Sequence, residues 1–329
     1  MVRLSDLGEV AIIKLLQDYV NDGLLGKNED AVAVSVSADL AMVANIDGLS
    51  WKDDVIPQMN DEQVGKKLVS ATISDLAAKG CSPSLFLSSL NFPPNWDSSQ
   101  LIGVAKGISQ ATADYGILYL GGDLGSALDS PVLVGVAVGF CKPDQLMSRA
   151  KIKPGDPIYS TGAFGFTGLG FAHLFADLDL PHELRERALE KILEPRARVR
   201  EGLQLAQTSA VTGSIDSSDG LAMSLHWLAE TSGIGIDVEK LPIDPLISEF
   251  AASQNLDPFE WVMYGGEEFE LIVALNQQEN SHVYEALRKA NVELIKIGHA
   301  TETTGEINFI SGGTRPVERR GWDSHRGFI

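Results

Sequence analysis

Cysteine is scarce in this chain, which has two in 329 residues. Cys81 and Cys141 do not have CxxC spacing, so we expect neither a disulfide framework nor a zinc site. Two buried thiols in a reducing cytoplasm are the simplest interpretation. Apolar runs of the roughly 18 residues that a transmembrane helix needs are absent, and the N-terminal residues lack a signal-peptide core. We therefore expect a cytoplasmic protein without a membrane partner.

Positive charge is also in short supply. The chain has 26 Lys and Arg against 45 Asp and Glu, a formal net charge of −19. Binding to nucleic acid needs clustered Lys and Arg, so we expect no nucleic-acid partner. An acidic surface is compatible with the binding of divalent cations or with a salt-adapted cell. The apolar fraction of 44% is ordinary for a globular protein, and the length allows two domains.

The first 145 residues predict the order β-β-α-β-α-β-β. Alternating apolar residues in 32–46 indicate two strands joined by a tight turn near 37–39, with Asp30 just before and Asp47 just after this hairpin. Further strands are expected at 86–90, 117–120 and 132–140, with helices at 60–80 and 98–116. This half is expected to form a four-stranded, mostly antiparallel sheet covered by two long helices.

Asp75 stands out because it is a carboxylate among the apolar residues of a predicted helix. Asn60 and Gln63 predict a capping box at the start of this helix, and Gly80 is a fitting stop. Burying a charge is costly unless another group pairs with it. Two interpretations are open from these residues alone: Asp75 lies on a solvated helix edge, or it points at a cation.

The second half alternates strands and helices. A polar turn at 151–156 separates two apolar runs, so we predict domains at residues 1–147 and 148–329, the second an α/β sandwich. Strands are expected at 157–160, 211–216, 234–238, 269–275 and 292–297. Helices are expected at 169–175, 183–193, 198–210, 221–231 and 282–290.

Six aspartates lie near strand ends or at turns that open helices, or stand within the apolar helix. Ligands of α/β proteins gather at the C-terminal ends of strands. Gly121 and Gly122 allow the backbone to approach a ligand closely. Oxygen ligands without a matching His or Cys cluster favour Mg2+ or Mn2+. Each aspartate alone could be a solvated turn residue, but together they predict a metal site: Asp30, Asp47, Asp75, Asp123, Asp216 and Asp219.

An ordered set of motifs resembles the thiamine-monophosphate kinases over nearly the whole chain. The motifs are the segments 4–9, 73–80, 121–123, 149–156, 216–221, 265–271 and 321–325, and 44–59 looks like the archaeal branch. The resemblance implies the superfamily of aminoimidazole ribonucleotide synthetase and selenophosphate synthetase. It therefore implies an α/β (α+β), two-domain PurM-like fold, in which the N-terminal sheet forms a barrel across a homodimer.

The resemblance also implies the reaction, in which ATP phosphorylates thiamine monophosphate to thiamine diphosphate with several Mg2+ ions. The six aspartates would hold the metal, and Gly121, Gly122, Arg149, Ser218 and Tyr115 would contact the nucleotide. Glu267, Trp322 and Asp54 would contact the substrate, and a stacked indole suits a flat thiazolium cation. The attacking phosphate oxygen is already ionised near neutral pH. We therefore expect neither a general base nor a covalent nucleophile, with Mg2+ easing the approach of two anions.

Some positions depart from the family pattern. Residues 28–30 read Asn-Glu-Asp instead of Gly-Asp-Asp, and 45–47 read Asn-Ile-Asp instead of Ser-Thr-Asp. Asp54 occupies the place of a bacterial substrate-contacting His, and 266–269 read Gly-Glu-Glu-Phe instead of Gly-Glu-Asp-Tyr. These differences leave two alternatives open: a paralogous ATP-dependent enzyme with another substrate, or a degenerate, non-catalytic nucleotide-binding protein.

Overall fold

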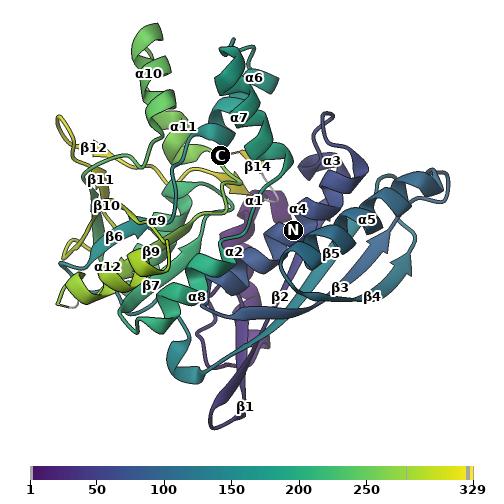
Figure 1. Cartoon of the computed structure of the whole chain (residues 1–329), viewed down its shortest axis with the longest axis horizontal. Coiled ribbons are helices and arrows are strands. Elements are labelled where there is room, and N and C mark those ends of the chain that lie inside the picture. The colour runs from purple at the N-terminus through teal and green to yellow at the C-terminus, as the bar shows by residue number, and fades with distance from the viewer. Residues whose placement is uncertain (1–2, 279, 324–326, 329) are drawn as a thin grey trace. The chain divides into compact units, whose positions relative to one another are not determined.

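The computed structural model describes residues 3–278, 280–323 and 327–328 (Figure 1). The chain forms two compact units, and each of them consists of separate segments of the sequence. The five-strand unit contains Asp30–Leu146 and Leu193–Ser209, and the seven-strand unit contains Met1–Glu29, Met147–Ile192 and Ala210–Ile329. The domain boundary that the sequence predicts between residues 147 and 148 stays a prediction. Among the described residues, no helix is long and apolar enough to cross a membrane.

The sheet of the five-strand unit has the order β1-β2-β5-β3-β4. Its strands are β1 (Val32–Ser37), β2 (Leu40–Ser50), β3 (Ser82–Asn91), β4 (Leu118–Gly125) and β5 (Val132–Cys141). Only β3 and β4 pair in parallel, so the mostly antiparallel arrangement is confirmed. The prediction of a four-stranded sheet was wrong, because all five predicted strands join one sheet, with β4 at its edge.

Helices α4 (Asp61–Ala78) and α5 (Ser98–Asp114) pack together, and α4 contacts β2 and β5. The predicted capping box is confirmed: the Asn60 side chain accepts from the Gln63 N–H at 2.9 Å, and the Gln63 side chain accepts from the Asn60 N–H at 3.0 Å. Gly80 follows the helix with a φ of 67°. The remaining helices of this unit are α3 (Trp51–Asp54), η2 (Pro143–Gln145) and α8 (Val199–Gln207).

The sheet of the five-strand unit buries one face and exposes the other. Residues on the face toward α4, such as Val43 and Leu133, are fully buried. Residues that alternate with them are apolar but exposed, and Ile46 keeps 69% of its surface accessible. We call this surface the open sheet face, and it contains Val32, Val34, Ile46, Leu87, Leu118, Leu120 and Val132. A contiguous apolar surface of this kind marks an interaction site.

The sheet of the seven-strand unit has the order β12-β11-β8-β10-β6-β9-β7. Its strands are β6 (Pro157–Ser160), β7 (Val211–Asp216), β8 (Gly235–Val238), β9 (Leu271–Leu275), β10 (Ile295–Thr301), β11 (Ile307–Phe309) and β12 (Arg315–Pro316). A separate ribbon pairs β13 (Trp322–Asp323) with β14 (Gly327–Phe328). The N-terminal segment adds α1 (Leu4–Leu7), α2 (Glu9–Leu16) and η1 (Gln17–Tyr19).

Six further helices belong mainly to this unit: α6 (Phe166–Phe175), α7 (His182–Leu193), α9 (Leu221–Ser232), α10 (Pro245–Gln254), α11 (Phe259–Tyr264) and α12 (Asn280–Lys289). The strands predicted at 157–160 and 211–216 are confirmed, and α9 packs its apolar side chains into the main core. Helices α10 and α11 were not predicted. The start of α10 is readable locally, because Asp244 accepts from the Leu246 N–H at 2.9 Å and Pro245 follows it.

Close contact between α4 and α5 gives a stability prediction. A Cβ atom on Gly107 would lie 1.9 Å from the backbone oxygen of Glu62. Gly107→Ala should therefore lower the free energy of unfolding by about 1–3 kcal/mol, measured by urea denaturation. The exposed neighbour provides the control, since Lys106→Ala should change it by less than about 0.5 kcal/mol. Equal stability of the two variants would contradict this packing.

Candidate active site

Asp75 and Asp30 form the acidic centre of the five-strand unit. Asn45 lies on the face of β2 that points toward α4, and its side-chain amide donates to the Asp75 carboxylate. A carboxylate oxygen of Asp30 lies within 4.8 Å of one of Asp75. The interpretation of Asp75 as a residue on a solvated helix edge is disfavoured, because its side chain is half-buried and faces other polar groups. These oxygen donors suit a hard divalent cation.

Lys79 balances the charge of Asp30. Its Nζ atom lies 2.7 Å from Asp30 Oδ2, and the two side chains are 0% and 2% exposed. A buried ion pair compensates for lost hydration only when the contact is close, as it is here. Lys79 was not predicted as a functional residue from the sequence. The available signal was a lone lysine between small residues at the end of a predicted helix.

The structure places two other aspartates differently from the prediction. Asp47 lies inside β2 rather than after it, and its carboxylate accepts from the Gly48 N–H at 2.8 Å. Asp123 lies inside β4 rather than in a turn, because β4 continues to pair with β3 beyond a register shift at Gly121 and Gly122, whose φ values are 90° and 155°. Within the described residues, neither carboxylate belongs to the close group of Asp30 and Asp75.

Gly122 shows why this strand needs glycine. A Cβ atom there would lie 1.7 Å from the Ser88 backbone oxygen.

Two other predicted contact residues lie at helix ends. Tyr115 is the C-cap of α5, and its hydroxyl accepts from the Ala197 N–H at 2.9 Å. Burial raises the pKa of Tyr115. Asp54 ends α3, and its carboxylate accepts from the Ser50 N–H at 2.7 Å. The nucleotide and substrate contacts of these residues stay predictions.

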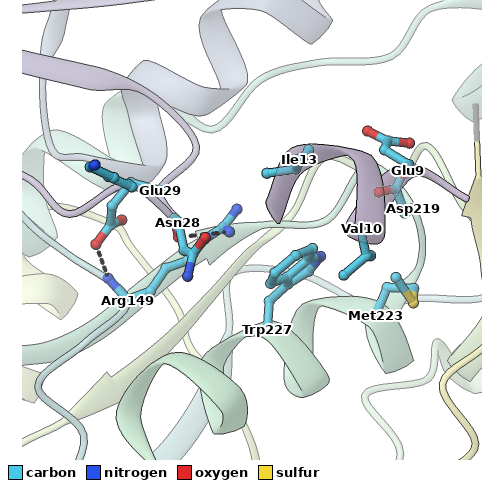
Figure 2. A pocket seen from close by; sticks show the side chains of 10 residues that line it. Glu9, Val10, Ile13, Asn28, Glu29, Arg149, Asp219, Met223 and Trp227 are labelled. Atoms are coloured by element: carbon cyan, nitrogen blue, oxygen red, sulfur yellow. Dashed lines mark hydrogen bonds between the residues drawn. The ribbon is translucent and has the colours of Figure 1, made fainter. Parts of the chain in front are cut away.

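A pocket of about 170 Å³ lies in the seven-strand unit and has Arg149 and Asp219 in its lining (Figure 2). The backbone N–H of Arg149 donates to the Glu29 carboxylate at 2.9 Å, and its guanidinium donates to the Asn28 carbonyl at 3.1 Å. The guanidinium carbon lies 5.4 Å from the centre of the Trp227 ring. Glu29 and Trp227 were not predicted as pocket residues, because they are far from Arg149 in the sequence and come close to it only in the fold.

Arg149 keeps its charge although it is buried. Loss of hydration lowers the pKa of Arg149 to about 10, while Glu29, Asp216 and Asp219 act in the opposite direction. A pKa near 10 leaves the group protonated at neutral pH. Buried arginine of this kind is suited to planar recognition of phosphate.

Two loops of the seven-strand unit contact each other, and one of them contains the pocket residue Asp219. Strand β7 ends at the buried Asp216, and the loop that follows leads through Ser218 into α9. The Glu267 N–H donates to the Ser218 carbonyl at 2.6 Å, and the Phe269 N–H donates to the Ser217 carbonyl at 2.9 Å. Ser218 and Glu267 are therefore neighbours, as the prediction of one site requires. Trp322 lies in β13, but its side chain is outside the described part of the chain.

The Lys79 contact gives a second prediction. Lys79→Met should lower the free energy of unfolding by about 3–5 kcal/mol, because Asp30 would stay buried without its cation. Lys66→Met is the matched control, in the helix whose C-cap is Lys79, since the ion pair of Lys66 with Glu194 is longer, 3.7 Å, and more exposed. This control should cost at most about 1 kcal/mol. Similar costs for both variants in urea denaturation would refute a dominant role for the buried pair.

Comparisons with known proteins agree with this architecture. The family model for the N-terminal domain of AIR synthase related protein matches residues 28–141, and that for the C-terminal domain matches residues 153–309. A thiamine-monophosphate kinase of Pyrococcus horikoshii is 31% identical, over 85% of this chain and 86% of its own. That of Nitrosopumilus maritimus is 29% identical, over 98% of this chain and 100% of its own.

Two solved structures show the same fold. A crystal structure of a protein from Thermus thermophilus is 30% identical, with a TM-score of 0.85 over 95% of this chain and 100% of its own. AaThiL complexed with AMPPCP and TMP also has a TM-score of 0.85, at 23% identity, over 98% of this chain and 99% of its own. The two-domain α/β fold of the PurM type is therefore confirmed.

Proposed function

This chain belongs to the thiamine-monophosphate kinase family, and on that premise we propose that its aspartates hold several Mg2+ ions during phosphoryl transfer. The chain is an ATP-dependent phosphotransferase that converts thiamine monophosphate to thiamine diphosphate. The observation that carries the metal proposal is the close approach of the Asp30 and Asp75 carboxylates beside Asn45. All donor atoms there are oxygens, which matches the preference of Mg2+.

The proposed roles of the site residues are those that the family resemblance implies. Metal would be held by Asp30, Asp47, Asp75, Asp123, Asp216 and Asp219. ATP would be contacted by Gly121, Gly122, Arg149, Ser218 and Tyr115, and thiamine monophosphate by Glu267, Trp322 and Asp54. The buried cation of Arg149 and the contact between the Ser218 and Glu267 loops support part of this assignment.

The reaction needs the side chains mainly to position the substrates and the metal. The acceptor phosphate is already ionised, so no residue has to remove a proton from it. Bound Mg2+ would offset the repulsion between the two phosphate groups and favour in-line transfer. Within the protein, Asn45 orients Asp75 and Lys79 holds Asp30 through Oδ2, which fixes both carboxylates before a substrate binds.

Two of the departures from the family pattern have structural explanations that speak against a degenerate protein. Asn45, in place of the usual hydroxyl residue, donates to Asp75. Glu29, in place of Asp, accepts from the Arg149 N–H through its carboxylate. These two replacements support residues of the proposed site, whereas Asn28 contacts Arg149 through its backbone carbonyl, which any residue offers.

We further propose that the chain forms a homodimer through the open sheet face. An exposed apolar sheet face of this kind is the surface that a second copy would cover.

Three other expectations stay predictions. They are that residues 1–147 bind ATP and Mg2+, that residues 148–329 form a C-terminal α/β domain, and that the protein is cytoplasmic.

Replacing one carboxylate tests the metal proposal. Asp75→Asn should lower kcat by a factor on the order of 100 or more, because a neutral amide holds a divalent cation poorly. Circular dichroism and Tm should stay close to those of the wild type. Asp61→Asn makes the same change in the first turn of the same helix and should keep the turnover. Wild-type formation of thiamine diphosphate by Asp75→Asn would disprove its role as a metal ligand.

Light scattering tests the dimer. The wild type should have about twice the chain mass of 35.4 kDa. Leu118→Asp combined with Leu120→Asp places charge on the open sheet face and should give monomers. Phe175→Asp changes a residue that is 65% exposed in the other unit and should leave the dimer intact. A monomeric wild type, or an intact dimer in the double variant, would argue against this interface.

A further inference from the structure

Glu268 is a buried acid that has no role in the reaction as proposed above. It lies between α11 and β9 and is only 3% exposed. Its Oε1 atom accepts from the Gly165 N–H at 2.8 Å and from the Thr167 N–H at 3.2 Å. Both donors belong to the start of α6, whose first N–H groups have no partner inside the helix. Glu268 thus attaches the 265–270 loop to the N-terminus of a ten-residue helix.

The residues on either side of Glu268 have an unusual backbone. Glu267 has a φ of 64° and Phe269 a φ of 51°, although neither is glycine. This left-handed conformation costs free energy for residues with a Cβ atom. It persists only where surrounding contacts enforce it, and such positions cluster at functional sites. Both N–H groups are also tied to the neighbouring loop, through Ser218 and Ser217.

A second anchor follows two residues later. The fully buried Glu270 accepts from the Thr161 hydroxyl at 2.8 Å, and its carboxylate lies 3.5 Å from Lys191 Nζ. The Thr161 hydroxyl in turn accepts from the Leu271 N–H at 2.9 Å. The loop is therefore fixed at alternate residues, Glu268 and Glu270.

Burial raises the pKa of Glu268 above its usual range. Lys191 and the N–H groups of Thr167 and Gly165 act in the other direction, and the Glu270 carboxylate adds to the increase. In both protonation states, Oε1 can accept the two backbone hydrogen bonds. Its anchoring role therefore depends on an acceptor oxygen at this place and not on a titration.

We propose that Glu268 is a positioning residue for Glu267. By anchoring the loop to the start of α6, it holds the left-handed backbone that presents the Glu267 side chain to the thiamine moiety of the substrate. This rests on the substrate contact proposed above for Glu267. Glu268 itself does not touch the reacting groups.

Three variants separate positioning from simple support of the fold. Glu268→Ala removes the acceptor oxygen and should raise KM for thiamine monophosphate by about tenfold or more, with a smaller change in kcat. Glu268→Gln keeps an acceptor oxygen and should hold KM within about twofold of the wild type, even if Tm falls.

Asp156→Ala is the matched control. Asp156 is a buried carboxylate of the same unit that accepts from the N–H of Lys153 and the hydroxyl of Thr212. Its loss should lower Tm without a change in KM. If Glu268→Ala does not fold, Glu268→Asp serves instead, because its shorter side chain withdraws the oxygen from the two N–H groups.

The outcomes are distinct. A KM that rises in Glu268→Ala but not in Glu268→Gln or Asp156→Ala supports the proposal. A wild-type KM in Glu268→Ala, or equal increases in Glu268→Ala and Glu268→Gln, overturns it. Calorimetric titration of the wild type with thiamine monophosphate, in the presence of a non-hydrolysable ATP analogue, tests separately whether the protein binds this substrate. Failure of the wild type to bind and turn over this substrate would contradict the proposed function instead.

Discussion

Acidic side chains that leave water need a nearby cation or several hydrogen-bond donors, and this constraint governs both units of the protein. In the five-strand unit, Lys79 is buried with Asp30 and Asn45 donates to Asp75. In the seven-strand unit, backbone N–H groups at the start of a helix serve Glu268. Each arrangement fixes a carboxylate in one orientation, which a flexible acid on the surface could not achieve.

The same constraint connects the structure to the reaction. A chain with a net charge of −19 must bring two phosphate-bearing molecules together. Its carboxylates would repel both substrates unless divalent cations lay between them. Arg149 supplies a cation from the protein itself, and it is held by the Asn28 backbone carbonyl and the Glu29 carboxylate. The acidity of the protein is therefore consistent with a kinase that relies on bound metal.

Local signals in the sequence were enough for the elements that their own residues define. The helix around Asp75 was predicted with its cap because Asn60 and Gln63 are three residues apart. The strands at 157–160 and 211–216 were predicted because short apolar runs end at polar turns. The ordered motifs identified the family, which the relatives confirm.

Features that depend on distant residues could not be predicted in this way. Asp123 was expected in a turn, because the two glycines before it are typical of turns. It lies in a strand because this segment pairs with β3. Lys79 and Trp227 gain their roles from Asp30 and Arg149, which are remote from them in the chain. The open sheet face was readable only once the register of five strands was known.

The central claim is that the protein itself holds Mg2+ beyond the ion that accompanies ATP. The most direct test follows the formation of thiamine diphosphate by phosphorus NMR while free Mg2+ is increased at a fixed, saturating concentration of MgATP. If the protein holds Mg2+ of its own, the rate keeps rising after all ATP is complexed. A rate that becomes constant as soon as ATP is complexed would contradict it.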